Sequence, residues 1–302
     1  MNRQPNMHVY YKKSSKVLII QWFNRAYIFT VLIYKSMYDE NIKLEIQPSD
    51  DVIPQKVPKL VFIVPYRDRE QQKSFFLRQM QYVLEDMNKD DYAIYFAHQC
   101  DNRDFNRGAM KNIGFLAMKQ KYPNDYQNIT FVFNDVDTMP YTKNFLKYET
   151  THGNVKHFYG YTYTLGGIVS IKGSDYEKSN GFPNLWAWGY EDNMFQKRVQ
   201  TCGLHIDRSQ FYPIMDKNIL QMKDGLERVV NRTEYERFRF NTTDGLRTIE
   251  DLVYNIDDNT MFINITNFKA EVVNNTANNT VHDLRKGNTV FGRPQSKMRM
   301  FL

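Results

Sequence analysis

Cysteine is scarce in this chain, and its scarcity excludes two classes of fold. Only Cys100 and Cys202 occur among 302 residues, and they form no Cys-x-x-Cys pair. A disulfide scaffold or a cysteine-rich zinc site needs more thiols than this. Long hydrophobic runs are also scarce: residues 17–34 approach the length of a membrane span, but Asn24 and Arg25 interrupt them. The fold must therefore be stabilised by a hydrophobic core.

Large apolar side chains are plentiful enough to build that core. Hydrophobic residues make up 42% of the chain, with 21 Tyr and 21 Phe, so wholesale disorder is excluded. The length suits one large α/β domain with extensions, or two ordinary domains. A net charge of +6 permits polyanionic partners such as a phosphorylated substrate. The acidic residues interleaved with the basic ones argue against a continuous nucleic-acid-binding stripe, and we expect no nucleic-acid partner.

Composition divides the chain into three parts. Residues 1–57 are a basic N-terminus with the apolar run 17–34 and a proline-containing linker, 58–273 form the main folded domain, and 274–302 are a polar, basic tail. The run 17–34 has two interpretations. It is either a signal anchor, which would place the protein in a secretory-pathway membrane with the N-terminus in the cytoplasm, or an amphipathic helix packed on the domain of a cytoplasmic protein.

The pattern after residue 58 predicts an α/β fold. Short, almost continuous apolar runs alternate with segments whose apolar residues recur with a 3.6-residue period, as in a sheet covered by helices on both faces. Strands are expected at 59–64, 92–97, 129–133 and 167–171, helices at 76–87, 109–118, 174–179 and 191–202, and weaker strands at 260–265 and 270–273. This order predicts a doubly wound half-domain that continues into a mixed sheet.

Ligands of open α/β sheets bind beyond the carboxyl ends of the strands, so the residues just after each strand are informative. Arg67 and Arg69 follow the first strand, Arg107 follows the second, and Asp135 and Asp137 follow the third. Two carboxylates one residue apart can hold a divalent cation and a ligand hydroxyl. Guanidinium groups suit diphosphate oxygens. Each residue alone could be a surface ion-pair partner or a turn residue, but their convergence predicts a site for a metal-bound phosphorylated ligand.

Five motifs in order give the chain a family resemblance. It resembles the β-1,4-galactosyltransferase family over residues 58–268, and the motifs are Pro65-Tyr66-Arg67-Asp68-Arg69, Phe105-Asn106-Arg107-Gly108, Asp135-Val136-Asp137, Gly166-Gly167, and Gly181-Phe182-Pro183-Asn184 running into Trp186-Ala187-Trp188-Gly189-Tyr190-Glu191-Asp192. The resemblance implies a single catalytic domain with a GT-A type, Rossmann-like mixed sheet that binds a nucleotide sugar. It also implies UDP-sugar donors, manganese dependence and inversion at the anomeric carbon.

The resemblance assigns roles to individual residues. In the donor site, Asp135 would face the donor sugar or ribose, and the uridine and diphosphate pocket would comprise Pro65, Arg67 and Arg69, closed by Phe105 and Arg107, with Val136 and Gly167 beside them. Asp137 would bind the metal. Trp188 would lie on a mobile loop that folds over the donor, and Glu191 and Asp192 would hold the acceptor sugar. An inverting transfer needs one carboxylate as general base, and Asp192 is the candidate. Trp188 could instead fill the core, and Asp192 could simply begin a helix.

The chain departs from the family at the metal site and at the donor pocket. Members supply a Met and, three residues later, a His as further metal ligands, whereas this chain has Met222 and Gly225. Asp224 could substitute and would favour oxygen-preferring ions, magnesium as well as manganese. The family's disulfide cysteines are absent. An aromatic residue before the paired glycines is replaced by Thr164 and Leu165, which leaves room for N-acetylgalactosamine.

These observations predict a metal-assisted, inverting transferase that moves galactose or N-acetylgalactosamine from UDP to a terminal sugar of a glycan or glycoconjugate. The alternative is a catalytically silent carbohydrate-binding relative, which the missing His favours. Membrane attachment depends on residues 17–34. The sequence specifies neither the acceptor nor the oligomeric state.

Overall fold

The structure is a computed structural model. It describes residues 56–223, 225–283 and 285, and the backbone of four strands nearer the N-terminus. The chain divides into two compact units, residues 1–56 and 57–302. The first unit contains an antiparallel sheet in the order β1-β2-β3-β4, with β1 at Met7–Lys12, β2 at Val17–Asn24, β3 at Tyr27–Tyr34 and β4 at Ile46–Pro48.

The packed helix considered for residues 17–34 is not formed, and their membrane attachment stays a prediction. The run forms β2 and β3, which pair in antiparallel register with Asn24 opposite Tyr27. Its β-branched and aromatic residues suit strands, and the polar interruption coincides with the end of β2. In the part of the chain that the structure describes, no helix combines the length and the apolar character needed to cross a bilayer.

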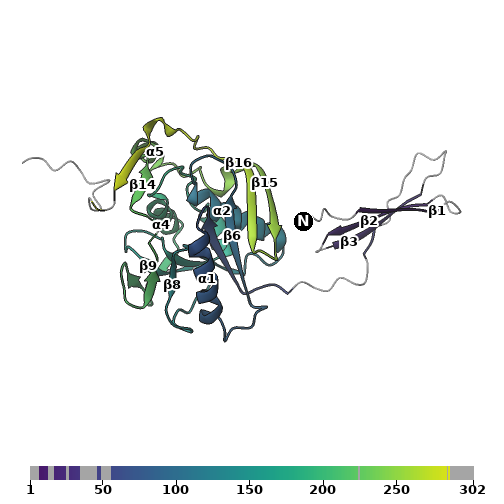
Figure 1. Ribbon diagram of the computed structural model, residues 1–302, viewed down its shortest axis with the longest axis horizontal. Coiled ribbons are helices and arrows are strands. Elements are labelled where there is room, and N and C mark those ends of the chain that lie inside the picture. Colours follow the sequence, from purple (N-terminus) through teal and green to yellow (C-terminus); the bar gives the residue numbers. More distant parts are fainter. Residues whose placement is uncertain are drawn as a thin grey trace, which may run out of the picture. The chain divides into compact units, whose positions relative to one another are not determined.

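The second unit is built on a nine-stranded mixed sheet (Figure 1). The strand order is β11-β9-β10-β7-β5-β6-β16-β15, and β12 pairs with β9 beside β11. Strands β7, β5, β6 and β16 are mutually parallel, whereas β10, β9 and β15 introduce antiparallel pairs. The sheet strands are β5 (Leu60–Tyr66), β6 (Tyr92–Gln99), β7 (Thr130–Asn134), β9 (Asn154–Gly160), β10 (Ile168–Lys172), β11 (His205–Asp207), β12 (Tyr212–Pro213), β15 (Glu250–Asp257) and β16 (Phe262–Lys269).

Two short two-stranded sheets and the helices complete this unit. One small sheet pairs β8 (Thr138–Pro140) with β13 (Ile219–Gln221), and the other pairs β14 (Glu227–Val230) with β17 (Thr280–Asp283). The helices are α1 (Glu70–Val83), α2 (Arg107–Lys121), α3 (Gly173–Lys178), α4 (Glu191–Thr201) and α5 (Arg232–Phe238), with 3₁₀ turns η1 (Leu246–Thr248) and η2 (Thr276–Asn278).

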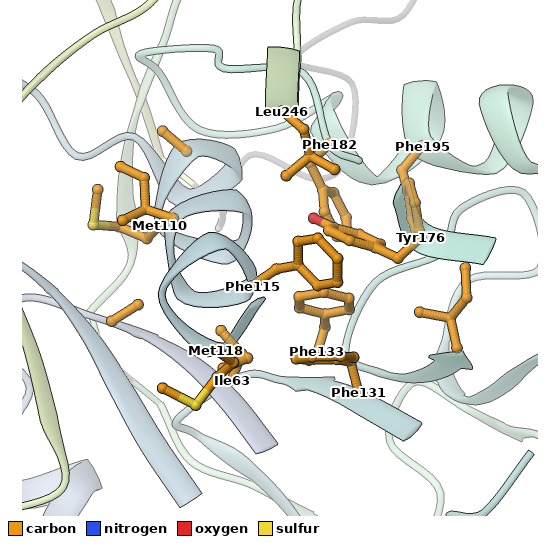
Figure 2. Packing of buried hydrophobic residues seen from close by; sticks show 14 of the residues in the cluster. Ile63, Met110, Phe115, Met118, Phe131, Phe133, Tyr176, Phe182, Phe195 and Leu246 are labelled. Atoms are coloured by element: carbon orange, nitrogen blue, oxygen red, sulfur yellow. The ribbon is translucent and has the colours of Figure 1, made fainter. Parts of the chain in front are cut away.

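Side-chain alternation along β5 shows that both faces of the sheet are covered. Phe62 packs in one core cluster with Phe76 of α1, whereas Ile63 packs in the other with residues of α2. Since successive side chains of a strand point to opposite faces, α1 and α2 lie on opposite sides of the sheet. On the α2 side, Phe115 and Phe133 lie close to Tyr176 and Phe182 in an aromatic cluster (Figure 2). Phe182 also stacks on Phe195 of α4, so the cluster packs the carboxyl end of β7 against that helix.

The C-terminal region differs from the predicted polar tail. Residues 280–283 form β17, which pairs with β14 in antiparallel register, so the folded unit extends at least ten residues past the predicted end at residue 273. Polar and apolar residues alternate over too few positions in this Asn-rich segment for the sequence to distinguish a strand from a loop. Strand β16 was expected at 260–265 and occurs at Phe262–Lys269, but no strand forms at 270–273.

Candidate active site

A cavity of about 780 Å³ opens at the carboxyl ends of β5 and β7. The residues that follow these strands, the loop that leads into the paired glycines and the start of α4 line it. The predicted site residues that line it are Pro65, Arg67, Arg69, Phe105, Arg107, Asp135, Val136, Asp137, Gly167, Trp188, Glu191 and Asp192. Asp137 and Asp192, the predicted metal ligand and the predicted base, therefore share one cavity, although 54 positions separate them in the sequence.

The Asp135-Val136-Asp137 segment is held by the residues on either side of it. Asn134 is fully buried at the end of β7, and its amide donates to the carbonyls of Asp135 at 2.8 Å and Thr138 at 2.7 Å. The Thr138 hydroxyl donates to Asp137 Oδ1 at 2.9 Å. These bonds fold the chain sharply after the strand, so that both carboxylates reach the cavity.

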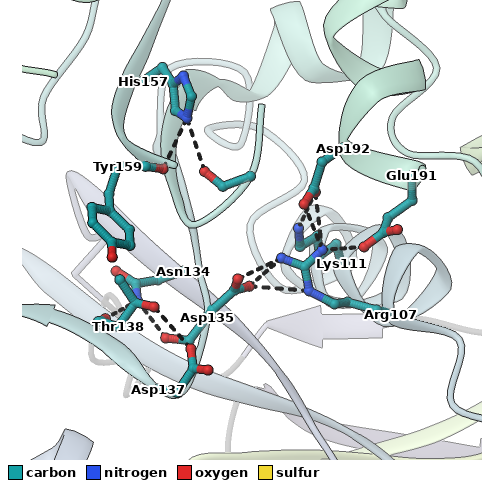
Figure 3. Close-up of polar contacts among 11 residues, drawn as sticks. Arg107, Lys111, Asn134, Asp135, Asp137, Thr138, His157, Tyr159, Glu191 and Asp192 are labelled. Carbon is teal, nitrogen blue, oxygen red and sulfur yellow. Dashed lines mark hydrogen bonds and ion pairs between the residues drawn. The ribbon is translucent and has the colours of Figure 1, made fainter. Parts of the chain in front are cut away.

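Arg107 is the centre of a charge cluster that joins three elements (Figure 3). It begins α2, and its Nη2 donates to Asp135 Oδ2 at 2.7 Å, while its Nη1 donates to Glu191 and, at 3.0 Å, to Asp192 Oδ2. The prediction had Arg107 closing a uridine and diphosphate pocket with Phe105. That role stays a prediction. In the structure, which holds no nucleotide, the guanidinium pairs with carboxylates because the start of α4 brings Glu191 and Asp192 within reach of it.

The pKa values of the two carboxyl groups at the start of α4 are shifted in opposite directions. Burial raises the pKa of Glu191, and the neighbouring negative charge of Asp192 raises it further. One Glu191 oxygen, Oε2, is buried without a hydrogen-bond partner. Burial also acts to raise the pKa of Asp192, but Arg107 and Lys111 outweigh it and the net shift is downward. Of the two groups, Asp192 is therefore the one that the site favours as a carboxylate.

The paired glycines are required by close packing around Asp192. A Cβ on Gly166 would lie 2.2 Å from Asp192 Oδ2. Gly167 has φ +67°, which favours glycine, and a Cβ there would lie 2.4 Å from the Tyr159 carbonyl oxygen. The backbone N–H of Leu165 donates to the Asp192 carbonyl at 3.0 Å. The glycine pair thus lets this loop approach α4 closely and leaves the Asp192 carboxylate at the cavity wall.

The loop 181–190 carries one buried and one exposed tryptophan. Trp186 is 3% exposed and its indole N–H donates to the Val272 carbonyl, whereas Trp188 is 45% exposed at the cavity. The core role that the sequence left open for Trp188 thus belongs to Trp186 instead. The Trp188 backbone N–H donates to the Val229 carbonyl of β14 at 2.8 Å. Gly189 and Tyr190 both have positive φ, so the chain turns sharply between Trp188 and α4.

The arginines that follow the first strand, Arg67 and Arg69, line the cavity together with Pro65. Arg67 donates to the Arg103 carbonyl, and its guanidinium carbon lies 5.3 Å from the centroid of the Phe105 ring. Arg69 donates to the Asp68 carbonyl at 3.1 Å and is half-buried. Their role as a phosphate-binding wall stays a prediction.

The predicted metal ligands are only partly brought together. Met222 is not part of the cavity lining, but its backbone N–H donates to the Asp137 carbonyl at 2.8 Å because β13 runs beside β8. Asp224 lies outside the described residues. Among the residues that the structure describes, no three His, Cys, Asp or Glu side chains form a group that could hold a metal ion.

Sequence reasoning missed several residues of the site. Lys111 contacts Asp192 from α2, and the cavity lining also includes Tyr159, Tyr161, Tyr163, Asn193, Ile214, Gln221 and Arg228. Lys111 had a detectable signal, since a lysine interrupts the apolar face of the helix four residues after Arg107 and therefore points to the same side. The tyrosines carried no such signal, because β9 was not predicted.

Comparisons with known proteins show which sequences and structures this chain resembles. Residues 39–149 match the family model "N-terminal region of glycosyl transferase group 7", and residues 148–222 match "N-terminal domain of galactosyltransferase". The β-1,4-galactosyltransferase 4 of Cricetulus griseus is 28% identical over 226 residues, which cover 70% of this chain and 63% of that protein. Human β-1,4-galactosyltransferase 1 is 31% identical over 172 residues, covering 53% of this chain and 41% of that protein. The chain thus spans less than two thirds of the length of these relatives.

A solved structure has the same fold. The crystal structure of a mutant Drosophila β-1,4-galactosyltransferase 7 in complex with manganese, UDP-Gal and xylobiose superimposes with a TM-score of 0.55 at 22% identity. The match covers 72% of this chain and 96% of that one. The prediction of a GT-A type mixed sheet flanked by helices is therefore confirmed.

Proposed function

Because this chain belongs to the β-1,4-galactosyltransferase family, we propose that it transfers galactose or N-acetylgalactosamine from a UDP-sugar to a terminal sugar of a glycan, with inversion and with the help of a divalent metal ion. The observation that carries the proposal is the shared cavity of Asp137 and Asp192, with Trp188 at its exposed edge. These are the groups that a single-displacement transfer requires: a metal-binding carboxylate, a base and a cover for the donor.

In this reaction the acceptor hydroxyl oxygen attacks the anomeric carbon while the bond from that carbon to the diphosphate oxygen breaks. Asp192 takes the hydroxyl proton, and UDP leaves with the bonding electron pair. Asp192 suits this role because Arg107 and Lys111 keep it ionised before the acceptor arrives. Glu191, which also lines the cavity, can form a hydrogen bond with a sugar hydroxyl. Arg67 and Arg69 face the region where the diphosphate would lie.

The residues near Asp137 fit a divalent ion of the kind bound with nucleotides. Such ions are commonly held by one or two carboxylates, with substrate phosphates and water as the remaining ligands, so the lack of a three-residue cluster is compatible with binding. Asp137 would supply the oxygen ligand, with Met222 and Asp224 as the further candidates. The ion would neutralise the charge that develops on the departing diphosphate.

The proposal is tested by measuring UDP release from UDP-galactose and UDP-N-acetylgalactosamine with a panel of terminal-sugar acceptors. Release should require both an acceptor and either Mn²⁺ or Mg²⁺, and EDTA should abolish it. The galactosyltransferase 7 relative was crystallised with xylobiose, so a terminal xylose belongs in the panel. Failure of both donors to bind in the presence of either metal would contradict the proposal.

A silent carbohydrate-binding relative is the second candidate, and Gly225 at the position of a family metal ligand favours it. The two functions differ in the variant Asp137→Asn. An enzyme would lose metal-dependent donor binding and transfer, whereas a silent relative would bind glycans equally well with and without the substitution and would never release UDP.

A further inference from the structure

Lys111 is a buried cation at the candidate active site. It lies on α2 one helical turn after Arg107, so both side chains leave the same side of the helix. Lys111 is only 1% exposed, and it is surrounded by residues that pack into the apolar core. Lysine is almost never fully buried unless it is paired, because removing an ammonium group from water is costly. A specific partner must offset that cost.

The partner is the Asp192 carboxylate. Lys111 Nζ donates to Asp192 Oδ1 at 3.0 Å, and the ammonium lies 4.1 Å from the centroid of the Phe182 ring (Figure 3). The other Asp192 oxygen accepts from Arg107 at 3.0 Å and faces Gly166, whose missing side chain makes room for it. Asp192 is therefore fixed from three directions.

Lys111 is one of the two cations in the cluster. Arg107 and Lys111 together face the carboxyl groups of Asp135, Glu191 and Asp192. Three carboxyl groups therefore share two positive charges. Without Lys111, Arg107 alone would face all three, and protonation of Asp192 would relieve the imbalance. The charged or titratable groups packed around Asp192 are Arg107 and Lys111 from α2, Glu191 from α4, Asp135 after β7, and His157 from β9.

We propose that Lys111 is a positioning residue of the transfer reaction, which holds the Asp192 carboxylate ionised and oriented toward the acceptor. The inference rests on the proposed function, because it assigns Lys111 a role only through Asp192 as the base. It predicts that Lys111 sets the lower end of the pH range in which the protein transfers sugar.

The variant Lys111→Met tests this role, because methionine fills the buried space without a charge. The acidic limb of the pH profile of kcat/KM should move to higher pH by about one unit, the lower end of the shift caused by one adjacent opposite charge. The variant Lys111→Arg retains the positive charge, so the acidic limb of its pH profile should lie at the same pH as in the unchanged protein. Lys119→Met is the matched control: Lys119 lies on the same helix, pairs with Glu177 outside the cavity, and should leave the limb in place.

Melting temperature and UDP binding establish that each variant is folded, and Lys111→Gln replaces the Met variant if the latter does not fold. The inference is overturned if the unchanged protein transfers sugar and a folded Lys111→Met or Lys111→Gln variant has the same acidic limb in its pH profile of kcat/KM. That result would leave the proposed function intact. Absence of transfer by the unchanged protein at every pH would overturn the proposed function, and the role of Lys111 with it.

Discussion

Arg107 is the residue on which the geometry of the candidate site depends most. It connects the start of α2, the segment after β7 and the start of α4, which are far apart in the sequence. Three carboxyl groups around its guanidinium raise its pKa well above the ordinary value, although burial opposes this. Permanent charge at this position fixes Asp135 and Asp192 relative to each other. A donor diphosphate that needed Arg107 would have to displace these carboxylates, so Arg67 and Arg69 are the better phosphate ligands.

The substitution Asp192→Asn should lower the rate of catalysis much more than the affinity for the donor. Asp192→Asn keeps the shape of the side chain but removes the proton acceptor, so kcat should fall about 10²- to 10⁴-fold. UDP-sugar binding should change only a few-fold, because the nucleotide wall is formed by residues after β5. Titration calorimetry and initial rates measure the two effects. Asp86→Asn, in a surface ion pair with Lys143, is the control, and equal rates for the two variants would exclude Asp192 as the base.

At the level of elements, a short strand from the C-terminal region supports the loop that carries Trp188. The Trp188 backbone binds β14, and β14 pairs with β17 in a two-stranded sheet. A two-stranded sheet is marginally stable by itself. The position of Trp188 over the cavity therefore depends on residues about 90 positions later in the chain.

Shortening the chain tests that dependence. Removal of residues 280–302 deletes β17, whereas removal of residues 286–302 leaves it in place and serves as the control. We expect the longer deletion to raise the KM for the UDP-sugar about tenfold, since one or two backbone hydrogen bonds of about 1 kcal/mol each would no longer hold the loop. Steady-state kinetics measure the change. Equal KM values for the two shortened proteins would show that β17 does not support the loop.

The elements that sequence predicts well are those with long, regular patterns. Strands β5, β6 and β7 are continuous apolar runs buried on both faces, and α1, α2 and α4 carry a clear helical period, so their order and the residues at the strand ends follow from the sequence. Strands β15 and β17 are half-exposed, with polar residues among the apolar ones, and resemble loops. Strand β9 is largely buried, but Asn154, Lys156 and His157 interrupt its apolar pattern. The pairing of Arg107 with Glu191 could not be predicted, because it depends on how closely α4 approaches α2 across Gly166. The secondary structure of residues 17–34 could not be predicted from their pattern, because their apolar content fits a helix and a hairpin equally well.

At the scale of the whole molecule, two buried groups make opposite contributions to the dependence of stability on pH. Burial lowers the pKa of His157 to about 4, with Arg208 adding to the effect, and its ring accepts a hydrogen bond from Arg208 while lying 2.9 Å from the Tyr159 carbonyl. Burial raises the pKa of Glu234 to about 7, and this side chain accepts from the backbone N–H of Trp186 at 2.7 Å.

The signs of the two contributions follow from proton binding. Between pH 4 and 6.5 the unfolded chain protonates His157 and the folded chain does not, so this residue makes the free energy of unfolding rise with pH. Between pH 4.5 and 7 the folded chain keeps the proton on Glu234 and the unfolded chain releases it, so this residue makes the free energy of unfolding fall with pH. Each slope is about 1.4 kcal/mol per pH unit where the two states differ by one proton. The two therefore largely cancel between pH 4.5 and 6.5.

Replacing one of these two residues should reveal how the other makes the free energy of unfolding depend on pH. Relative to the unchanged protein, His157→Gln should lose stability as pH rises from 4.5 to 6.5, and Glu234→Gln should gain it, by about 2 to 3 kcal/mol over that range in each case. Denaturant unfolding at three pH values measures the slopes. The double variant should return to the slope of the unchanged protein, and His152→Gln, at an exposed histidine, should not alter it. Slopes of the same sign in the two single variants would contradict the assignment of opposite protonation states, because a neutral buried histidine and a neutral buried glutamic acid must respond to pH in opposite directions.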